Sequence, residues 1–277
     1  MNARRSVFEK VLLNSLIVLT ILFFLTPIYW LITTAFKYGR DAFAIPPQWF
    51  AFDFTLNNFK EVITGTKVGL FVKNSVIISL GTTALSLLLG VPAGFAIART
   101  KSKVLNSFSY FFLLLLMIPP TAMLIPFYLI VRDSGLMGTR LSIILLDTAF
   151  DASFVIWMMR SYFLDVPKEM EEAALVDGAN QFTAFLRVAL PMSIPGIISS
   201  ALYTFIFSWN DFIFALMLTT PKTKTIPLGI LASFSSVEIG WGRMAAMSLF
   251  AIIPAVIISL FLNRYFVQGL TFGATKG

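Results

Sequence analysis

Two aspartates, Asp147 and Asp151, stand four residues apart inside an apolar window of the sequence. This spacing places both side chains on one face of a helix, and carboxylates at membrane depth face protein or water. The pair is compatible with aspartyl catalysis, with a cation site, or with hydrogen-bond acceptors for sugar hydroxyls. Catalytic pairs usually come from separate facing segments, which disfavours the first option. The structural alternative places Asp147 near an outer interface and lets Asp151 bond a neighbouring helix.

A second polar group, Ser208-Trp209-Asn210-Asp211, ends a later apolar window. It combines an aromatic ring, an amide and a carboxylate, a mixture that suits the lining of a sugar-sized cavity. Packing against neighbouring helices explains the same residues equally well. The predicted solute pathway therefore consists of Asp147, Asp151, Trp209, Asn210 and Asp211.

An acidic stretch, EEAALVDGAN, covers residues 171–180 of an otherwise apolar chain. Pro167 marks a helix start, and the glutamates that follow it fall in the first turns, where the helix dipole favours carboxylates. Gly178 supplies the left-handed turn that ends this helix, and Asn180 caps a second helix that closes at Pro191. The stretch therefore predicts a helix over 168–177, a glycine turn and another helix.

This helical pair suits a docking surface for a partner, because Ala173 and Ala174 are strong helix formers with little bulk. Glu171 and Glu172 would supply ionic or hydrogen-bonding contacts, and the two alanines with Gly178 would supply the steric fit. Two other interpretations remain: dipole compensation by the glutamates, and an amphipathic loop that simply lies at the surface.

The composition identifies an integral membrane protein. Of 277 residues, 57% are hydrophobic and 13% are charged, against about a quarter charged in soluble domains. A membrane span needs about 20 predominantly apolar residues. Six windows qualify: 11–36, 74–98, 104–131, 141–159, 193–218 and 244–263. Prolines at 119, 120 and 126 indicate breaks in the third window.

Basic residues indicate the orientation of these spans. Arg4 and Arg5 precede the first window, and Arg99, Lys101 and Lys103 crowd a short loop without acids, which predicts that both segments are cytoplasmic. The first window lacks a signal-peptide cleavage site, so we expect a retained anchor. The net charge of +7 is scattered over loop ends, which disfavours nucleic-acid binding.

The residue inventory excludes several kinds of chemistry. With no cysteine and no histidine, the chain cannot form disulfides, thiolate or HExxH metal sites, or Ser-His nucleophile pairs. It also lacks the GxxxxGK[ST] phosphate loop. We therefore expect no metal, cofactor or catalytic residue on this chain.

The stretch from Glu172 to Pro191 resembles the EAA signature of importer-type ATP-binding-cassette (ABC) permeases. Glu172-Ala173-Ala174, Gly178 and Leu190-Pro191 stand at its spacing, and only Val188 departs, where isoleucine is usual. Most of the chain is similar to carbohydrate-type permeases, specifically the MalG-like subunit of maltose transporters. The further matching segments are Pro46-Pro47-x-Trp49, Asn74-Ser75, Met117 to Pro120 with Ile125-Pro126, Ser208 to Asp211, and Gly269 to Gly277.

The resemblance implies an all-α polytopic protein with six transmembrane helices, the transmembrane domain of a type I ABC importer. It implies a transport subunit in a bacterial or archaeal inner membrane, surrounded by lipid, with both termini cytoplasmic. Its expected partners are a second, MalF-like permease, two MalK-like ATPase subunits that use ATP and Mg²⁺, and an extracytoplasmic solute-binding protein. The ATPase groove would hold the coupling loop, for which we predict these residues: Glu171, Glu172, Ala173, Ala174, Asp177, Gly178, Leu190 and Pro191.

The chain is accordingly expected to divide into an N-terminal tail and first helix (1–36), an extracytoplasmic loop (37–70), a core (71–263) with the coupling loop at 165–191, and a cytoplasmic tail (264–277). A permease for glycerol phosphate or a polyol is the nearest alternative. More distant ones are an aspartyl hydrolase within the membrane, and an ion-coupled carrier, which should show internal symmetry that the sequence lacks.

Overall fold

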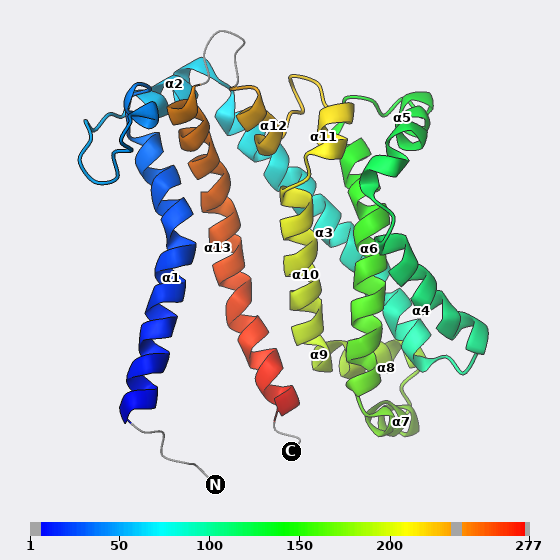
Figure 1. Cartoon of the computed structure of the whole chain (residues 1–277). Coiled ribbons are helices and arrows are strands. Elements are labelled where there is room, and N and C mark those ends of the chain that lie inside the picture. The colour runs from blue at the N-terminus through cyan, green and yellow to red at the C-terminus, as the bar shows by residue number, and fades with distance from the viewer. Residues whose placement is uncertain (1–6, 234–239, 275–277) are drawn as a thin grey trace. The chain divides into compact units, whose positions relative to one another are not determined.

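The computed structural model describes residues 7–233 and 240–274, and the side chains of residues 8–233 and 240–261. The described chain is almost entirely helical and contains no β-strand beyond one isolated bridge between Lys37 and Phe54. This confirms the all-α prediction. The main helices are α1 (Val7–Ala35), α2 (Asn57–Gly65), α3 (Val68–Arg99), α4 (Lys103–Leu116), α5 (Leu124–Asp133), α6 (Arg140–Asp165), α7 (Lys168–Val176), α8 (Gln181–Ala184), α9 (Leu190–Met192), α10 (Ile194–Trp209), α11 (Ile213–Leu218), α12 (Ile226–Leu231) and α13 (Trp241–Ala274) (Figure 1).

Four described helices, α1, α3, α6 and α13, are long and apolar enough to cross a membrane, and the number rises to six if each of two bent pairs forms one span. One bent pair, residues 103–116 and 120–133, turns by 92°. The break falls at Pro119 and Pro120, where the missing N–H groups interrupt the helix. The other pair, residues 181–192 and 194–209, turns by 75°. A separate break follows α10. The predicted window 193–218 is helical from Ile194 to Trp209, and α11 begins only at Ile213.

The chain packs as two compact units, residues 1–68 with 230–250, and residues 69–229 with 251–277. In the first unit, the loop after α1 is held by the fully buried Lys37, whose ammonium donates to the Gln48 carbonyl oxygen and lies 4.1 Å from the ring centre of Trp30. Asn58 of α2 donates to the carbonyls of Ala35 and Lys37. These contacts hold the loop that contains Pro46, Pro47 and Trp49 against the end of α1 and the start of α2.

In the second unit, α3 packs tightly against α6 through two glycines one helical turn apart. A Cβ atom at Gly90 would lie 2.6 Å from Cγ1 of Val155, and one at Gly94 would lie 2.9 Å from Cβ of Met159. Small residues at this spacing let two helix backbones approach closely within a membrane. The same region forms an apolar core that continues into the segment after α7 through Phe163 and Phe185.

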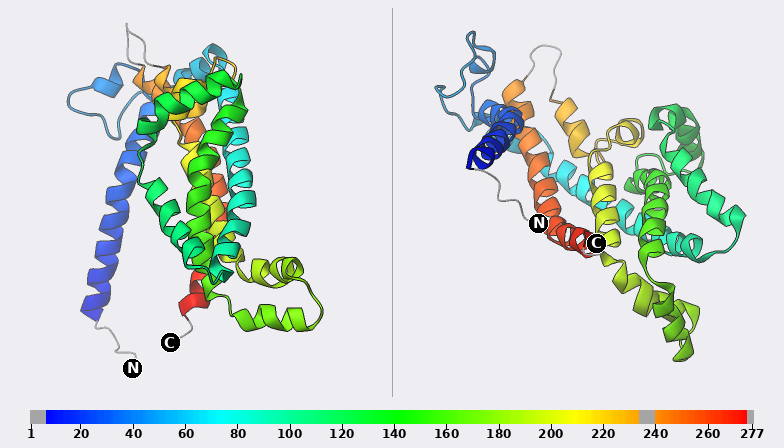
Figure 2. Two further views of the ribbon diagram at one scale, coloured as in Figure 1. Left: turned by 90° about the vertical axis from the view of Figure 1, so that its right-hand side faces the viewer. Right: turned by 60° about the horizontal axis from the view of Figure 1, so that its bottom comes forward.

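The two ends of this second unit carry different elements. Figure 1 shows α5, α11 and α12 at one end of α3, α6 and α10, whereas α7, α8 and α9 lie at the other end. At the α11 end, Asn74 donates to the carbonyls of Lys222 and Lys224 and accepts from Arg140. At the opposite end, α7 and α8 project sideways as a hairpin (Figure 2).

The last helix, α13, extends to Ala274, so its backbone includes most of the predicted tail from residue 264. Residues 275–277 lie outside the described residues.

Candidate functional site

The acidic stretch forms the helix, glycine turn and helix that its sequence predicts. Helix α7 follows Pro167, and Gly178 adopts φ +89°, a left-handed conformation that disfavours side chains with a Cβ. Asn180 then caps α8 by accepting from the backbone N–H of Thr183. A π-helical segment, Phe185–Ala189, and α9 continue this helix to Met192.

One glutamate of α7 belongs to the internal structure of the chain. The Arg99 guanidinium at the end of α3 makes two-point contact with Glu171, and only 15% and 12% of the two side chains are exposed. Arg99 also donates to the carbonyls of Phe163 and Val166 at the C-terminal end of α6, which have no intrahelical partner. A single side chain therefore joins α3, α6 and α7.

The other predicted coupling residues lie mostly on the outside. Two of them, Ala174 and Leu190, are half-buried. The other five are exposed: Glu172, Ala173, Asp177, Gly178 and Pro191. No residue of α7 is buried. Large apolar side chains are exposed on the same hairpin, with fractions of 51% at Met170, 88% at Val176 and 68% at Phe182. The hairpin therefore presents an apolar and acidic surface to its surroundings.

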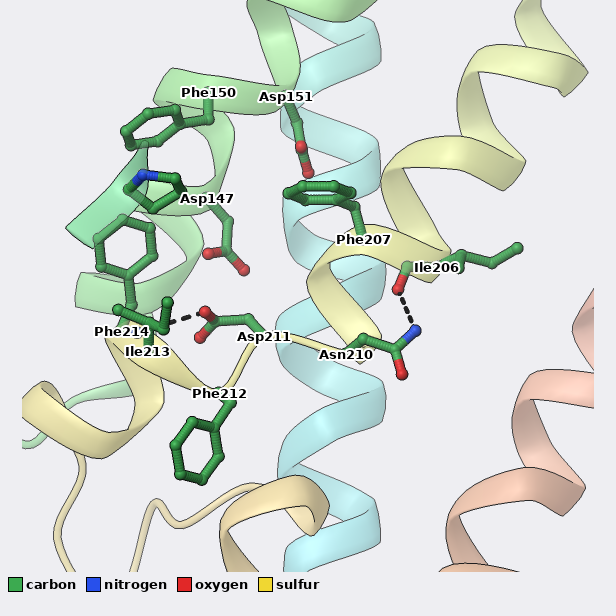
Figure 3. Close-up of a pocket in the computed structure, with 11 residues that line it drawn as sticks. Asp147, Phe150, Asp151, Ile206, Phe207, Asn210, Asp211, Phe212, Ile213 and Phe214 are labelled. Carbon is green, nitrogen blue, oxygen red and sulfur yellow. Dashed lines mark hydrogen bonds between the residues drawn. The ribbon is translucent and has the colours of Figure 1, made fainter. Parts of the chain in front are cut away.

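The second candidate region is a pocket of about 310 Å³ between α6 and the connection from α10 to α11. It brings together four of the five predicted pathway residues: Asp147, Asp151, Asn210 and Asp211. Its walls are otherwise apolar, and Figure 3 shows several phenylalanine rings around the carboxylates. The two aspartates of α6 thus share one face, as their spacing predicts.

The three carboxylates have different hydrogen-bond partners. Asp147 accepts from the Ser208 hydroxyl of α10 at 2.6 Å, and Asp211 accepts from the backbone N–H groups of Phe214 and Ala215 at the start of α11. Asp151 is 3% exposed, and its Oδ2 atom receives no hydrogen bond within the described part of the chain. The protein thus engages two of the acids and leaves an acceptor atom of the third free.

Trp209 takes a different position from the rest of its motif. It is buried, stacks on Phe205 at 5.6 Å between ring centres, and does not line the pocket. Its neighbour Phe207 lines the pocket instead, and Figure 3 shows its ring beside the Asp151 carboxylate. Sequence reasoning also missed Arg99 as a partner of Glu171. The only sequence signal was an arginine at the end of a long apolar window.

Comparisons with known proteins agree on one family. Residues 90–272 match the family model described as binding-protein-dependent transport system inner membrane component. The diacetylchitobiose uptake system permease protein DasC of Streptomyces coelicolor is 36% identical over 277 residues, which cover 99% of this chain and all of that protein. The trehalose/maltose transport system permease protein MalG of Thermococcus litoralis is 32% identical over 279 residues, covering 99% of each chain.

Solved structures share the fold. A chain of a bacterial ABC transporter involved in the import of the acidic polysaccharide alginate gives a TM-score of 0.76 at 21% identity, covering 96% of this chain and 99% of that chain. The MetNI methionine ABC transporter gives a TM-score of 0.60 at 18% identity, covering 72% of this chain and 94% of that chain. The helices described above therefore form the fold of ABC importer transmembrane domains.

Proposed function

Because the chain belongs to the family of binding-protein-dependent transport system inner membrane components, we propose that its α7–α9 hairpin is the surface on which cytoplasmic ATPase subunits dock. The chain is a multi-pass membrane protein and the permease subunit of a carbohydrate importer of the ABC class. The observation that carries the docking proposal is the projecting hairpin (Figure 2), which exposes the side chains of Glu172, Val176 and Phe182.

The partners follow from this assignment. A second, MalF-like permease completes the pathway, two MalK-like ATPases bind and hydrolyse ATP with Mg²⁺, and an extracytoplasmic binding protein delivers the solute. Both termini and the α7–α9 hairpin lie in the cytoplasm, since Arg4, Arg5, Lys101 and Lys103 mark that side. This chain supplies the pathway and the mechanical link, and carries no catalytic group.

Transmission begins at α7. Closure of the ATPase dimer displaces this helix, and Arg99 passes the displacement to α3 and α6 because it bonds to Glu171 and to two carbonyls of the α6 end. A bias of this kind requires a contact free energy that differs between two states of the permease. Glu171 then acts within the connection between α7, α3 and α6, which serves as a lever. Glu172, Ala173 and Gly178 remain available to the ATPase.

The pocket between α6 and α11 is the solute-contacting part of this subunit. Asp151 offers a free acceptor to a sugar hydroxyl, and the phenylalanine walls exclude water around the ring of the solute. Asp147 and Asn210 complete the polar lining, although Asn210 already donates to the Ile206 carbonyl.

The docking proposal is tested by Ala173→Trp in the purified transporter. Ala173 is exposed and helical, so tryptophan should be tolerated by the fold and should block a closely fitting partner. We expect loss of solute-stimulated ATP hydrolysis with unchanged membrane insertion. Ala51→Trp, at an exposed alanine of the loop after α1, is the matched control and should retain activity. Full stimulation in Ala173→Trp would contradict docking at α7.

A further inference from the structure

The pocket lining is unusual in the sign of its charges. Asp147, Asp151 and Asp211 bring three carboxylates to one cavity, and no lysine or arginine among the described side chains lines it. Within the described residues, none of the three forms an ion pair. Buried carboxylates in apolar surroundings are costly unless an opposite charge or hydrogen-bond donors compensate them.

The protein supplies only part of this compensation. Ser208 serves Asp147, and two backbone N–H groups serve Asp211, but Asp151 faces the pocket with Oδ2 unpaired at 3% exposure. Among the described residues, Asn210 provides the amide of the lining, and one of its two N–H groups donates to the Ile206 carbonyl. Because Oδ2 of Asp151 receives no hydrogen bond from the described residues, an occupant that bonds to this atom must bring the donor itself.

A metal ion does not match this geometry. Metals need several ligand atoms converging at short distance, and no group of three or more His, Cys, Asp or Glu side chains among the described residues could hold one. The aromatic wall points to an organic cation instead, because the ring of Phe207 lies beside the Asp151 carboxylate (Figure 3). Carboxylates combined with aromatic faces attract ammonium groups.

We infer that the pocket takes a solute of the amino sugar class, whose protonated amine is anchored by Asp151 while its hydroxyls face the remaining polar groups. The inference rests on the proposed function, since the sugar part comes from the carbohydrate importer role. A volume of 310 Å³ lies at the lower end of ligand cavities, which run from about 300 to 1,000 Å³, so it accommodates a single sugar ring. A uronic acid would be repelled.

The test compares two probes on the assembled transporter without its binding protein. Glucosamine and N-acetylglucosamine share one ring, but only the first carries an ammonium. Calorimetric titration is done without nucleotide and with a non-hydrolysable ATP analogue, so that access from either side is sampled. We expect glucosamine to bind at least about tenfold more tightly, as for a hydrogen bond to a charged group.

The variant Asp151→Asn tests whether Asp151 causes the preference for glucosamine over N-acetylglucosamine. It should lower the ratio of the two affinities to near one, whereas Asp133→Asn, which removes an exposed carboxylate outside the pocket, should keep the wild-type ratio. Thermal unfolding of both variants checks that they fold. Equal binding of the two probes, binding of neither, or an unchanged ratio in Asp151→Asn would overturn the inference.

These outcomes are separate from those of the docking test. If coupled ATP hydrolysis persists while the probes bind equally, the importer role stands and only the solute class is wrong. If the ATPase subunits fail to copurify, the proposed function itself is at fault.

Discussion

The two candidate regions treat buried charge in opposite ways. At the α7 end, Arg99 and Glu171 neutralise each other, and the remaining donors of Arg99 reach the carbonyls of Phe163 and Val166. In the pocket, three carboxylates meet no basic side chain from the described part of the chain, and Asp151 keeps an unpaired oxygen.

The difference distinguishes two kinds of buried charge: structural charges, which are paired within the chain, and receptive charges, which lack a partner in the chain and are available to a ligand. A charge whose partners all come from the same chain contributes to a fixed geometry, which a lever needs. A buried charge without a partner is destabilising in isolation and becomes favourable only when a ligand arrives. We therefore expect changes in the first region to alter stability and coupling, and changes in the pocket to alter solute binding.

The largest effect should follow from Arg99→Glu. This change removes the ion pair and places a second carboxylate against Glu171, and breaking a buried pair in this way costs about 3–5 kcal/mol. We expect a strongly lowered unfolding midpoint in detergent and loss of transport. Arg132→Glu is the matched control, because Arg132 is exposed and its ion pair, among the residues that the structure describes, is with its neighbour Asp133. An unchanged midpoint in Arg99→Glu would show that the three-helix junction does not depend on this side chain.

A smaller effect should separate the two adjacent glutamates of α7. Glu171→Gln keeps the shape but loses the charge-assisted bonds to Arg99, so we expect a loss of about 1.5–3 kcal/mol, the range for hydrogen bonds to charged groups. Glu172→Gln should leave the free energy of unfolding unchanged, because its side chain is exposed, and should reduce solute-stimulated ATP hydrolysis. An equal loss in the free energy of unfolding for both variants would contradict the structural role of Glu171.

The two aspartates of α6 provide the same comparison within the pocket. Asp147→Ala deprives the buried Ser208 hydroxyl of its 2.6 Å acceptor, and the expected loss of stability is about 1–2 kcal/mol. Asp151→Ala removes no bond within the described chain, so its unfolding midpoint should equal or exceed that of the wild type. A lower midpoint for Asp151→Ala than for Asp147→Ala would make Asp151 a structural residue.

The sequence predicted what depends on local chemistry. The helix from Lys168, the left-handed glycine at 178 and the cap at Asn180 follow from propensities and capping that act within a few residues. The apolar windows likewise predicted where the long helices lie, and Pro119 and Pro120 marked the break that the 92° bend confirms.

Long-range packing accounts for what the sequence left open. Arg99 and Glu171 are separated by 72 positions, so their pairing depends on how α3 and α6 approach through Gly90 and Gly94. The rotation of α10 decides that Phe207 faces the pocket while Trp209 is buried, and several polar and aromatic neighbours made either choice possible.

The smallest effect concerns a third kind of buried charge, Lys37 in the first unit. Its ammonium is fully buried against the Gln48 carbonyl and the rings of Trp30 and Phe52. Burial lowers the pKa of Lys37, and the Asp41 carboxylate opposes this by raising it. The unfolded chain, where the lysine pKa has its usual value, then binds more protons at pH values between the two.

Raising the pH through that window should therefore increase the free energy of unfolding of the wild type, and Lys37→Met should lack this increment. Unfolding midpoints measured from neutral to alkaline pH give the two slopes, and Lys60→Met, at an exposed lysine of α2, should keep the wild-type slope. If Lys37→Met follows the wild type at every pH, the surroundings of the buried ammonium compensate it as well as Glu171 compensates Arg99. Ion pairing would then not be what distinguishes a structural charge from a receptive one.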